Sequence, residues 1–150
     1  MRRTARQASL RGKVDDWDFL HTLTPAETDA LEDMGEPGTY APGQVIFEQG
    51  GTADCVLLVR GGRVRVTATA GDGEELLLAE RGPGELLGEL SGIDGQPRSA
   101  SVTALEEVRG LVVPLRAFRG FLLEHPRVAL SLLELISRRL REAEARRAGS

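Results

Sequence analysis

The sequence contains few of the residues that form disulfides, metal clusters and catalytic sites. Cys55 is the single cysteine among 150 residues, so cysteines cannot form an internal disulfide or a zinc or iron–sulfur site. His21 and His125 are far apart, lack carboxylates at metal-ligating spacing, and are not paired with a nucleophile. We therefore expect no metal, no cofactor and no enzymatic activity. Cys55 begins an apolar run and is expected to be buried as a small hydrophobic side chain.

Long hydrophobic runs and a basic excess are also missing. No stretch approaches the roughly 20 apolar residues of a membrane-spanning helix. The N-terminus is basic up to Lys13, but no apolar segment follows it, so it does not have the pattern of a signal peptide. The net charge of −4 argues against a dedicated nucleic-acid binder, because such domains usually carry a basic excess. These absences predict a cytoplasmic protein that does not associate with membranes.

The remaining composition is that of one soluble domain with short terminal extensions. Hydrophobic residues make up 41% of the chain and charged residues 28%, which is ordinary for a globular protein. Residues 1–13 are polar and lack periodicity, and they predict a disordered basic arm. Residues 14–125 form the expected domain, and residues 126–150 the expected C-terminal helix. Thr24-Pro25-Ala26-Glu27 has the pattern of a capping box with proline at the first helical position, which predicts a helix beginning there.

From Tyr40 onward the apolar residues recur with a period of two. Short apolar or alternating runs, such as residues 64–67 and 76–78, are separated by turn glycines spaced ten or eleven residues apart, at 50–51, 61–62, 71–73 and 82–84. Short strands with turn signals at this interval are typical of an antiparallel sandwich or small barrel. The sequence therefore predicts a mainly β fold with flanking helices, an antiparallel β-roll or jelly-roll (double-stranded β-helix), followed by a long C-terminal helix.

The last third of the sequence has the periodicity of helices. Residues 115–124 form a short segment that ends at His125, and Pro126 is tolerated at the start of a second helix that runs to about Arg147. Along this second helix, five apolar residues recur at steps of four and three: Ala129, Leu133, Ile136, Leu140 and Ala143. This is the spacing of a coiled-coil seam, and it predicts a two-fold homodimer through the helix.

Two further groups of residues lie on the same helix. Leu130, Leu132 and Leu135 widen its apolar surface and are expected to face the barrel. The arginines near its end are interpreted as a solvated helix terminus that suits the helix dipole: Arg138, Arg139, Arg141, Arg146 and Arg147.

Residues 88–102 carry the clearest chemical signal. Gly88 permits a tight turn before Glu89, and Arg98 follows nine residues after that glutamate. A carboxylate can accept from a sugar hydroxyl, and arginine binds a phosphate with a forked, permanently charged donor. The small residues Ser99 and Ala100 allow backbone N–H groups to approach a ligand. The segment therefore predicts a nucleotide site, and the alternative for Glu89 and Arg98 is an ion pair at the base of a loop.

This segment resembles the phosphate-binding cassette of the cyclic-nucleotide-binding domain family. Arg98-Ser99-Ala100 is similar to the cassette of bacterial cyclic-AMP receptor proteins, and the Glu-to-Arg spacing is similar to that of eukaryotic kinase regulatory subunits. The similarity extends over roughly residues 19–147. The resemblance implies that Gly88, Glu89 and Leu90 form a ribose site. It implies that Arg98, Ser99 and Ala100 form a cyclic phosphate site. The surface that lines the base would be formed by Val66, Leu78 and Leu87.

The sequence departs from the family pattern in three places. Bacterial receptors normally continue into a winged helix-turn-helix and this sequence ends at Ser150, so DNA binding by this chain alone is not expected. The hydroxyl that contacts the adenine amino group in the receptor proteins falls near Ala143, where Glu144 could accept instead. Gly84-Glu85-Leu86 imitates Gly88-Glu89-Leu90, so Glu85 is a rival ribose ligand, although Glu89 alone keeps the family spacing to Arg98.

Together these residues predict a cytoplasmic regulatory sensor without catalytic activity, whose ligand is cyclic AMP or another cyclic nucleotide. Two other interpretations remain open. The chain could be an interaction module that dimerises through its helix and no longer binds nucleotide. It could also be the sensor part of a transcription regulator whose DNA-binding domain is missing or is supplied by a partner.

Overall fold

The structure is a computed structural model that describes residues 18–149; the predicted arm, residues 1–13, lies outside them. The helical elements are η1 (Leu20–Thr22), α2 (Pro25–Asp33), α3 (Glu89–Asp94), α4 (Leu115–Glu124) and α5 (Pro126–Gly149). The strands are β1 (Glu36–Tyr40), β2 (Val45–Phe47), β3 (Cys55–Gly61), β4 (Val64–Thr69), β5 (Glu75–Arg81), β6 (Leu86–Leu87), β7 (Ser101–Ala104) and β8 (Val108–Pro114).

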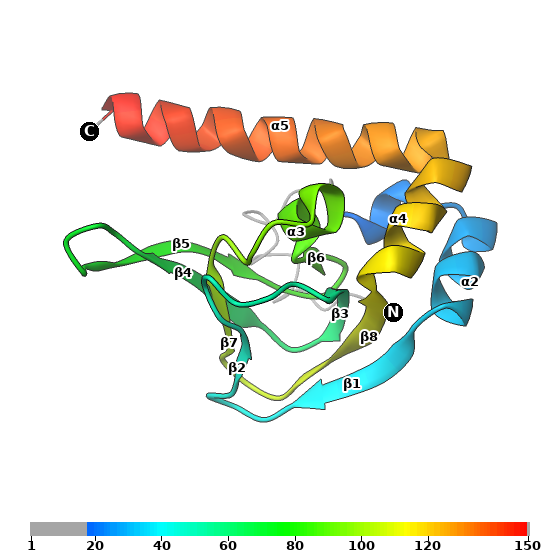
Figure 1. The fold of residues 1–150 in the computed structure, drawn as a ribbon, viewed down its shortest axis with the longest axis horizontal. Helices are drawn as coiled ribbons and strands as arrows, with labels where there is room; N and C mark the ends of the chain where they lie inside the picture. Colours follow the sequence, from blue (N-terminus) through cyan, green and yellow to red (C-terminus); the bar gives the residue numbers. More distant parts are fainter. Residues whose placement is uncertain (1–17, 150) are drawn as a thin grey trace, which may run out of the picture.

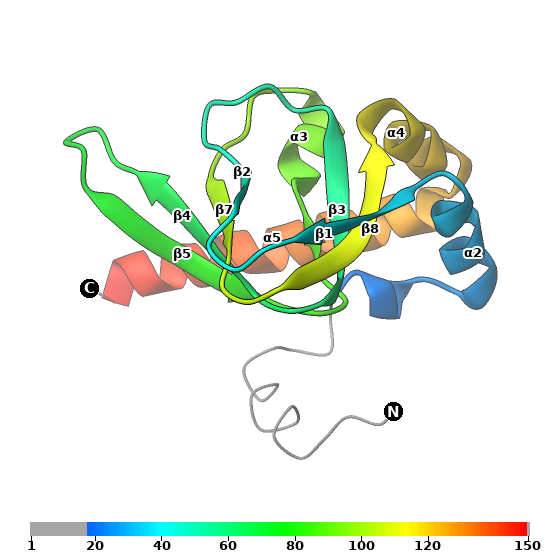
Figure 2. The same cartoon turned by 90° about the horizontal axis from the view of Figure 1, so that it is seen from below.

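Within the described residues the strands form two four-stranded antiparallel sheets. The strand order is β1-β8-β3-β6 in one sheet and β2-β7-β4-β5 in the other. Figure 1 shows the strands closing into a roll, with α5 running along one side of it, and Figure 2 shows the same roll from below. The predicted antiparallel β-roll followed by a long C-terminal helix is confirmed.

The helix that begins at Pro25 has the predicted capping box. The Thr24 hydroxyl accepts from the backbone N–H of Glu27, and the Glu27 carboxylate accepts from the backbone N–H of Thr24. These two bonds satisfy N–H groups that have no partner inside the helix. The bond from the Thr24 backbone N–H also holds the pKa of Glu27 below its ordinary value, and Arg127 acts in the same direction.

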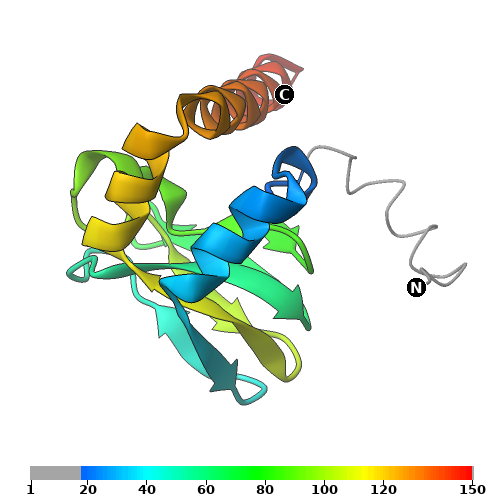
Figure 3. The same cartoon turned by 90° about the vertical axis from the view of Figure 1, so that its right-hand side faces the viewer.

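β3 is covered on both faces, which explains its apolar run without alternation. Because successive strand residues point to opposite faces, Val56 and Leu58 join one core and Leu57 and Val59 join another. The first core lies between this sheet and the helices and includes Leu31, Phe118, Phe121, Val128, Leu132 and Leu135. Figure 3 shows α2, α4 and α5 on that side of the strands. The second core lies between the two sheets.

α5 buries one narrow face and leaves two of the five residues of the predicted seam exposed, whereas Ala129, Ile136 and Ala143 are half-buried. Val128, Leu132 and Leu135 are buried against the first core, whereas Leu133 and Leu140 of the seam are 54% and 57% exposed. The expectation that Leu130 faces the barrel is wrong, because its side chain is exposed. Residue 130 is two positions from the buried residues 128 and 132, which places it on the opposite side of the helix. Across residues 18–149 no helix combines the length and apolar character needed to span a bilayer.

Candidate ligand-binding cleft

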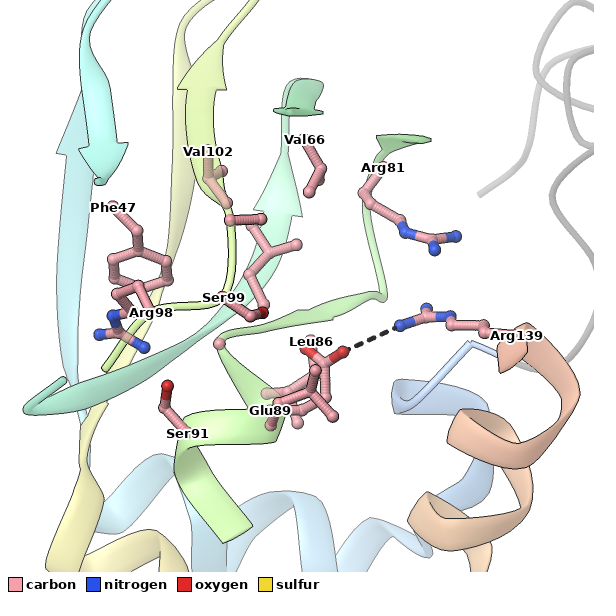
Figure 4. A pocket seen from close by; sticks show the side chains of 14 residues that line it. Phe47, Val66, Arg81, Leu86, Glu89, Ser91, Arg98, Ser99, Val102 and Arg139 are labelled. Carbon is pink, nitrogen blue, oxygen red and sulfur yellow. Dashed lines mark hydrogen bonds and ion pairs between the residues drawn. The ribbon is translucent and has the colours of Figure 1, made fainter. Parts of the chain in front are cut away.

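A cleft opens between the second sheet, β6, α3 and α5 (Figure 4). Its empty volume is about 560 Å³, which includes the part that is open to solvent. Apolar side chains from four strands form one wall: Phe47, Val66, Leu86, Leu87 and Val102. Polar and charged side chains stand at its two ends. In Figure 4, Arg98 lies beside Phe47 at one end, and Arg81 and Arg139 lie at the other.

Arg98 places a buried cation at the first end. The residue is 5% exposed, its Nη2 donates to the Cys55 carbonyl at 2.7 Å, and its Cζ lies 3.7 Å from the centre of the Phe47 ring. The Asp54 carboxylate is 3.9 Å away and largely in solvent, so it neutralises the guanidinium weakly. Nη1 is buried and has no hydrogen-bond partner within residues 18–149. Because a buried charge with an unused donor is unfavourable, this end of the cleft suits an anionic ligand.

Gly88 makes room for this guanidinium. It connects β6 to α3 with φ at +81°, a conformation that side chains rarely adopt. A Cβ at this position would lie 2.5 Å from Nη1 of Arg98 and 3.2 Å from the Phe47 ring. The glycine is therefore required both by its backbone conformation and by the close approach of Arg98.

Glu89 begins α3 and presents a carboxylate to the cleft. Its Oε2 is 3.4 Å from Nη1 of Arg139, which is long for a charge-assisted hydrogen bond. A carboxylate held this loosely can accept from a ligand hydroxyl. Within residues 18–149, Arg98 forms an ion pair with Asp54, and Glu89 forms one with Arg139. The ion pair between Glu89 and Arg98 that the sequence left open is therefore not found among the described residues.

Glu85, the rival of Glu89, is occupied elsewhere. It is 3% exposed, and its Oε1 accepts from Nη2 of Arg139 at 2.8 Å and lies 3.4 Å from Nη1 of Arg81. Burial raises the pKa of Glu85 above its ordinary value, and the two arginines oppose that rise. Its side chain does not line the cleft, so the geometry favours Glu89 as the residue that meets a ligand.

The structure brings most of the sequence-predicted site residues to this cleft. Its lining includes all six residues of the predicted ribose and phosphate sites: Gly88, Glu89, Leu90, Arg98, Ser99 and Ala100. Val66 and Leu87 of the predicted base surface line it too, but Leu78 does not, and its side chain is exposed on β5. The register between β4 and β5 shifts at this point: Val66 pairs with Ala79, and the next residue, Thr67, pairs with Leu77. Leu78 therefore has no direct partner on β4. The geometry therefore does not support Leu78 as a lining residue.

Sequence reasoning missed six residues that line the cleft and misassigned the last of them: Phe47, Arg81, Leu86, Ser91, Val102 and Arg139. Arg139 was assigned to a solvated helix end, but its side chain is 18% exposed and bonded to Glu85 and Glu89. Its position four residues after Leu135 and seven after Leu132 puts it on the buried face of α5, a signal the sequence contains. Arg81 and Phe47 stand at the ends of β5 and β2, and no local pattern marks them as lining residues.

Cys55 lies beside the anion-binding end of the cleft, next to Arg98, rather than inside the core. The residue is half-buried, because it is the first residue of β3 and adjoins the Arg98 guanidinium. Burial raises the pKa of the Cys55 thiol, with the neighbouring Asp54 acting in the same direction. The thiol therefore stays protonated near neutral pH, but the prediction that Cys55 is buried is wrong, because the residue is half-buried.

The cleft combines three features: a buried cation with an unused hydrogen-bond donor, a loosely held carboxylate and an apolar wall. A ligand that satisfies all of them carries one anionic group, a hydroxyl and a flat or apolar part. The fold and site therefore define a β-roll domain with a cleft suited to a small anionic ligand beside a long C-terminal helix.

Comparisons with known proteins identify the family. Residues 37–125 match the family model described as the cyclic nucleotide-binding domain. The chain is 39% identical over 126 residues to the cyclic AMP receptor protein of Thermus thermophilus, covering 84% of this chain and 58% of that protein. It is 33% identical over 119 residues to a CRP-like cAMP-activated global transcriptional regulator of Mycobacterium tuberculosis, covering 79% and 53%.

A solved structure gives the same result. The catabolite activator protein of Thermus thermophilus superposes with a TM-score of 0.77 at 38% identity, covering 85% of this chain and 60% of that chain. This chain belongs to the cyclic nucleotide-binding domain family. It spans slightly more than half the length of the two curated relatives.

Proposed function

We propose that this protein is a regulatory sensor that binds a cyclic nucleotide, with cyclic AMP as the preferred ligand, and that it has no catalytic activity. The observation that carries the proposal is the Arg98 guanidinium, which is buried at the cleft with Nη1 unpartnered within the described residues. A cyclic phosphodiester carries a single negative charge, and its oxygens are the hydrogen-bond acceptors that Nη1 lacks. Family membership and two relatives whose names refer to cyclic AMP support the same ligand class.

The nucleotide would lie across the cleft with each of its parts on a different set of residues. Its phosphate would bind Arg98, Ser99 and Ala100, and the ribose 2′-hydroxyl would donate to the Glu89 carboxylate. Its base would face the apolar side chains Val66 and Leu87. Binding transmits a signal only if the ligand prefers one arrangement of α5 over another, because equal affinity for both arrangements shifts nothing.

A thermal-shift panel tests this function. Cyclic AMP at 100 times its Kd is expected to stabilise the fold by about 2.7 kcal/mol. For a domain of this size that corresponds to a rise in Tm of about 5–10 °C. The linear nucleoside monophosphates are expected to give no comparable shift. If no cyclic nucleotide raises Tm, the sensor proposal is wrong, and the nucleotide-independent interaction module takes its place.

We further propose that the sensor is a homodimer joined along α5. Leu133 and Leu140 are apolar, more than half exposed and spaced seven residues apart, as a self-complementary helical seam requires. Two aligned copies would bury these side chains against each other.

Replacing both Leu133 and Leu140 with glutamate is expected to convert the dimer into a monomer, because the seam would then hold like charges. Sedimentation velocity of the full chain measures this directly. Leu123→Glu is the matched control, since Leu123 is also exposed but lies on α4, away from the seam. A wild-type chain that sediments as a monomer, or a doubly substituted chain that remains dimeric, would exclude this interface.

A further inference from the structure

The outer half of α5 is attached to the roll by charge rather than by apolar packing. The buried residues of α5 are Val128, Leu132 and Leu135, and Ile136 packs against the same core, so the core contacts of α5 within the described residues end at Ile136. One turn further, the Arg139 guanidinium reaches two carboxylates, at 2.8 Å from Glu85 and 3.4 Å from Glu89. The position of the helix beside the cleft therefore depends on which of these carboxylates holds Arg139.

The two carboxylates differ in how firmly they are held. Glu85 is fixed by its backbone, because its carbonyl accepts from the N–H of Val59 on the central strand β3 at 2.9 Å. The preceding Gly84 donates to the Val59 carbonyl at 2.8 Å, so the residue is bonded to the sheet from both sides. Glu89 lies in the short helix α3 at the edge of the cleft, and its bond to Arg139 is the longer one.

We propose that Glu85 is a positioning residue that holds Arg139, and with it the outer half of α5, at the edge of the cleft and so leaves Glu89 to a ligand hydroxyl. Glu85 draws the guanidinium toward itself, and the Glu89 carboxylate remains able to accept. The role of Glu85 in ligand binding rests on the proposed cyclic-nucleotide function, but its role as the anchor of α5 does not.

The burial of Glu85 explains why the pair is maintained. A carboxylate this deeply buried is unfavourable unless cations are close, and Arg81 and Arg139 are both within 3.4 Å of its Oε1. Substitution by glutamine keeps the size of the side chain and its ability to hydrogen-bond, and removes the charge. Glu85→Gln therefore tests the ion pair with little change in packing.

The first experiment needs no ligand. Hydrogen exchange of the unliganded full chain is expected to be roughly tenfold faster in residues 140–149 of Glu85→Gln than of wild type, because a charge-assisted bond is lost. Arg139→Gln is expected to give at least this increase, because it also loses the pair with Glu89, and the double variant no increase beyond that of Arg139→Gln. Glu80→Gln is the control. Glu80 lies on β5, as Arg81 does, and forms a more exposed ion pair with Arg63. Exchange in Glu85→Gln that equals wild type or Glu80→Gln overturns the proposal.

The second experiment measures the availability of Glu89. Calorimetric titration with cyclic AMP and its 2′-deoxy analogue is expected to show a preference of tenfold or more for the ribose form in wild type. In Glu85→Gln the released Arg139 pairs with Glu89, and the preference is expected to fall to about threefold or less. Adding Arg139→Gln restores it. A preference that Glu85→Gln leaves unchanged overturns this role, whereas failure of wild type to bind either nucleotide overturns the proposed function and not the anchor.

Discussion

Replacing Arg98 with alanine is expected to weaken cyclic-nucleotide binding by tenfold to over a hundredfold. The guanidinium is the buried cation at the anion-binding end of the cleft, and Nη1 has no hydrogen-bond partner within residues 18–149. Hydrogen bonds to charged groups contribute about 1.5–3 kcal/mol, which corresponds to this range of affinity. Calorimetric titration of wild type and Arg98→Ala with cyclic AMP measures the loss.

Two further variants separate this effect from changes in folding or overall charge. Arg98→Lys keeps the positive charge but lacks the forked donor, so its affinity is expected to lie between those of wild type and Arg98→Ala. Arg65→Ala removes the same charge from an exposed position on β4 and is expected to bind as wild type does. Equal affinities for wild type and Arg98→Ala would remove Arg98 from the site.

Replacing Gly88 with alanine is expected to reduce both affinity and stability. The added Cβ would stand 2.5 Å from Nη1 of Arg98, so the guanidinium would have to leave its position beside Phe47. We expect a loss of affinity of about tenfold or more, comparable with the loss of a charge-assisted contact. The left-handed backbone adds a destabilisation of about 1–2 kcal/mol, which thermal unfolding measures.

Gly43→Ala is the matched control for this second effect. Gly43 has a similar φ of +85°, but a Cβ added there would have no neighbour within 4 Å. The variant is expected to lose a similar amount of stability and to keep wild-type affinity. Equal affinities for Gly88→Ala and Gly43→Ala would show that the contact between residue 88 and Arg98 does not matter for binding.

The fold was largely predictable from local patterns. Turn glycines at regular intervals marked the ends of strands, and the predicted helix at residues 115–124 matches α4 in both bounds. β1 begins four residues earlier than the period-two pattern suggested, because Pro37 and Gly38 are poor strand residues. Proline is accommodated there because β1 is the edge strand of its sheet and pairs with β8 alone.

The site was predictable where its residues are close in the sequence. Glu89 and Arg98 lie within one short segment, and their chemistry and spacing were enough to predict that both line one site, as they do in the cleft. Arg139 is 54 residues from Glu85 and 50 from Glu89, so their contact depends on how α5 packs on the roll. The exclusion of Leu78 depends on a shift in strand register that alternation alone does not reveal.

A crystal structure of the full chain with cyclic AMP tests the central claim most directly. The account predicts a phosphate oxygen within hydrogen-bond distance of Nη1 of Arg98, and a ribose 2′-hydroxyl bonded to the Glu89 carboxylate. A nucleotide bound outside this cleft, or inside it with its phosphate turned away from Arg98, would contradict it.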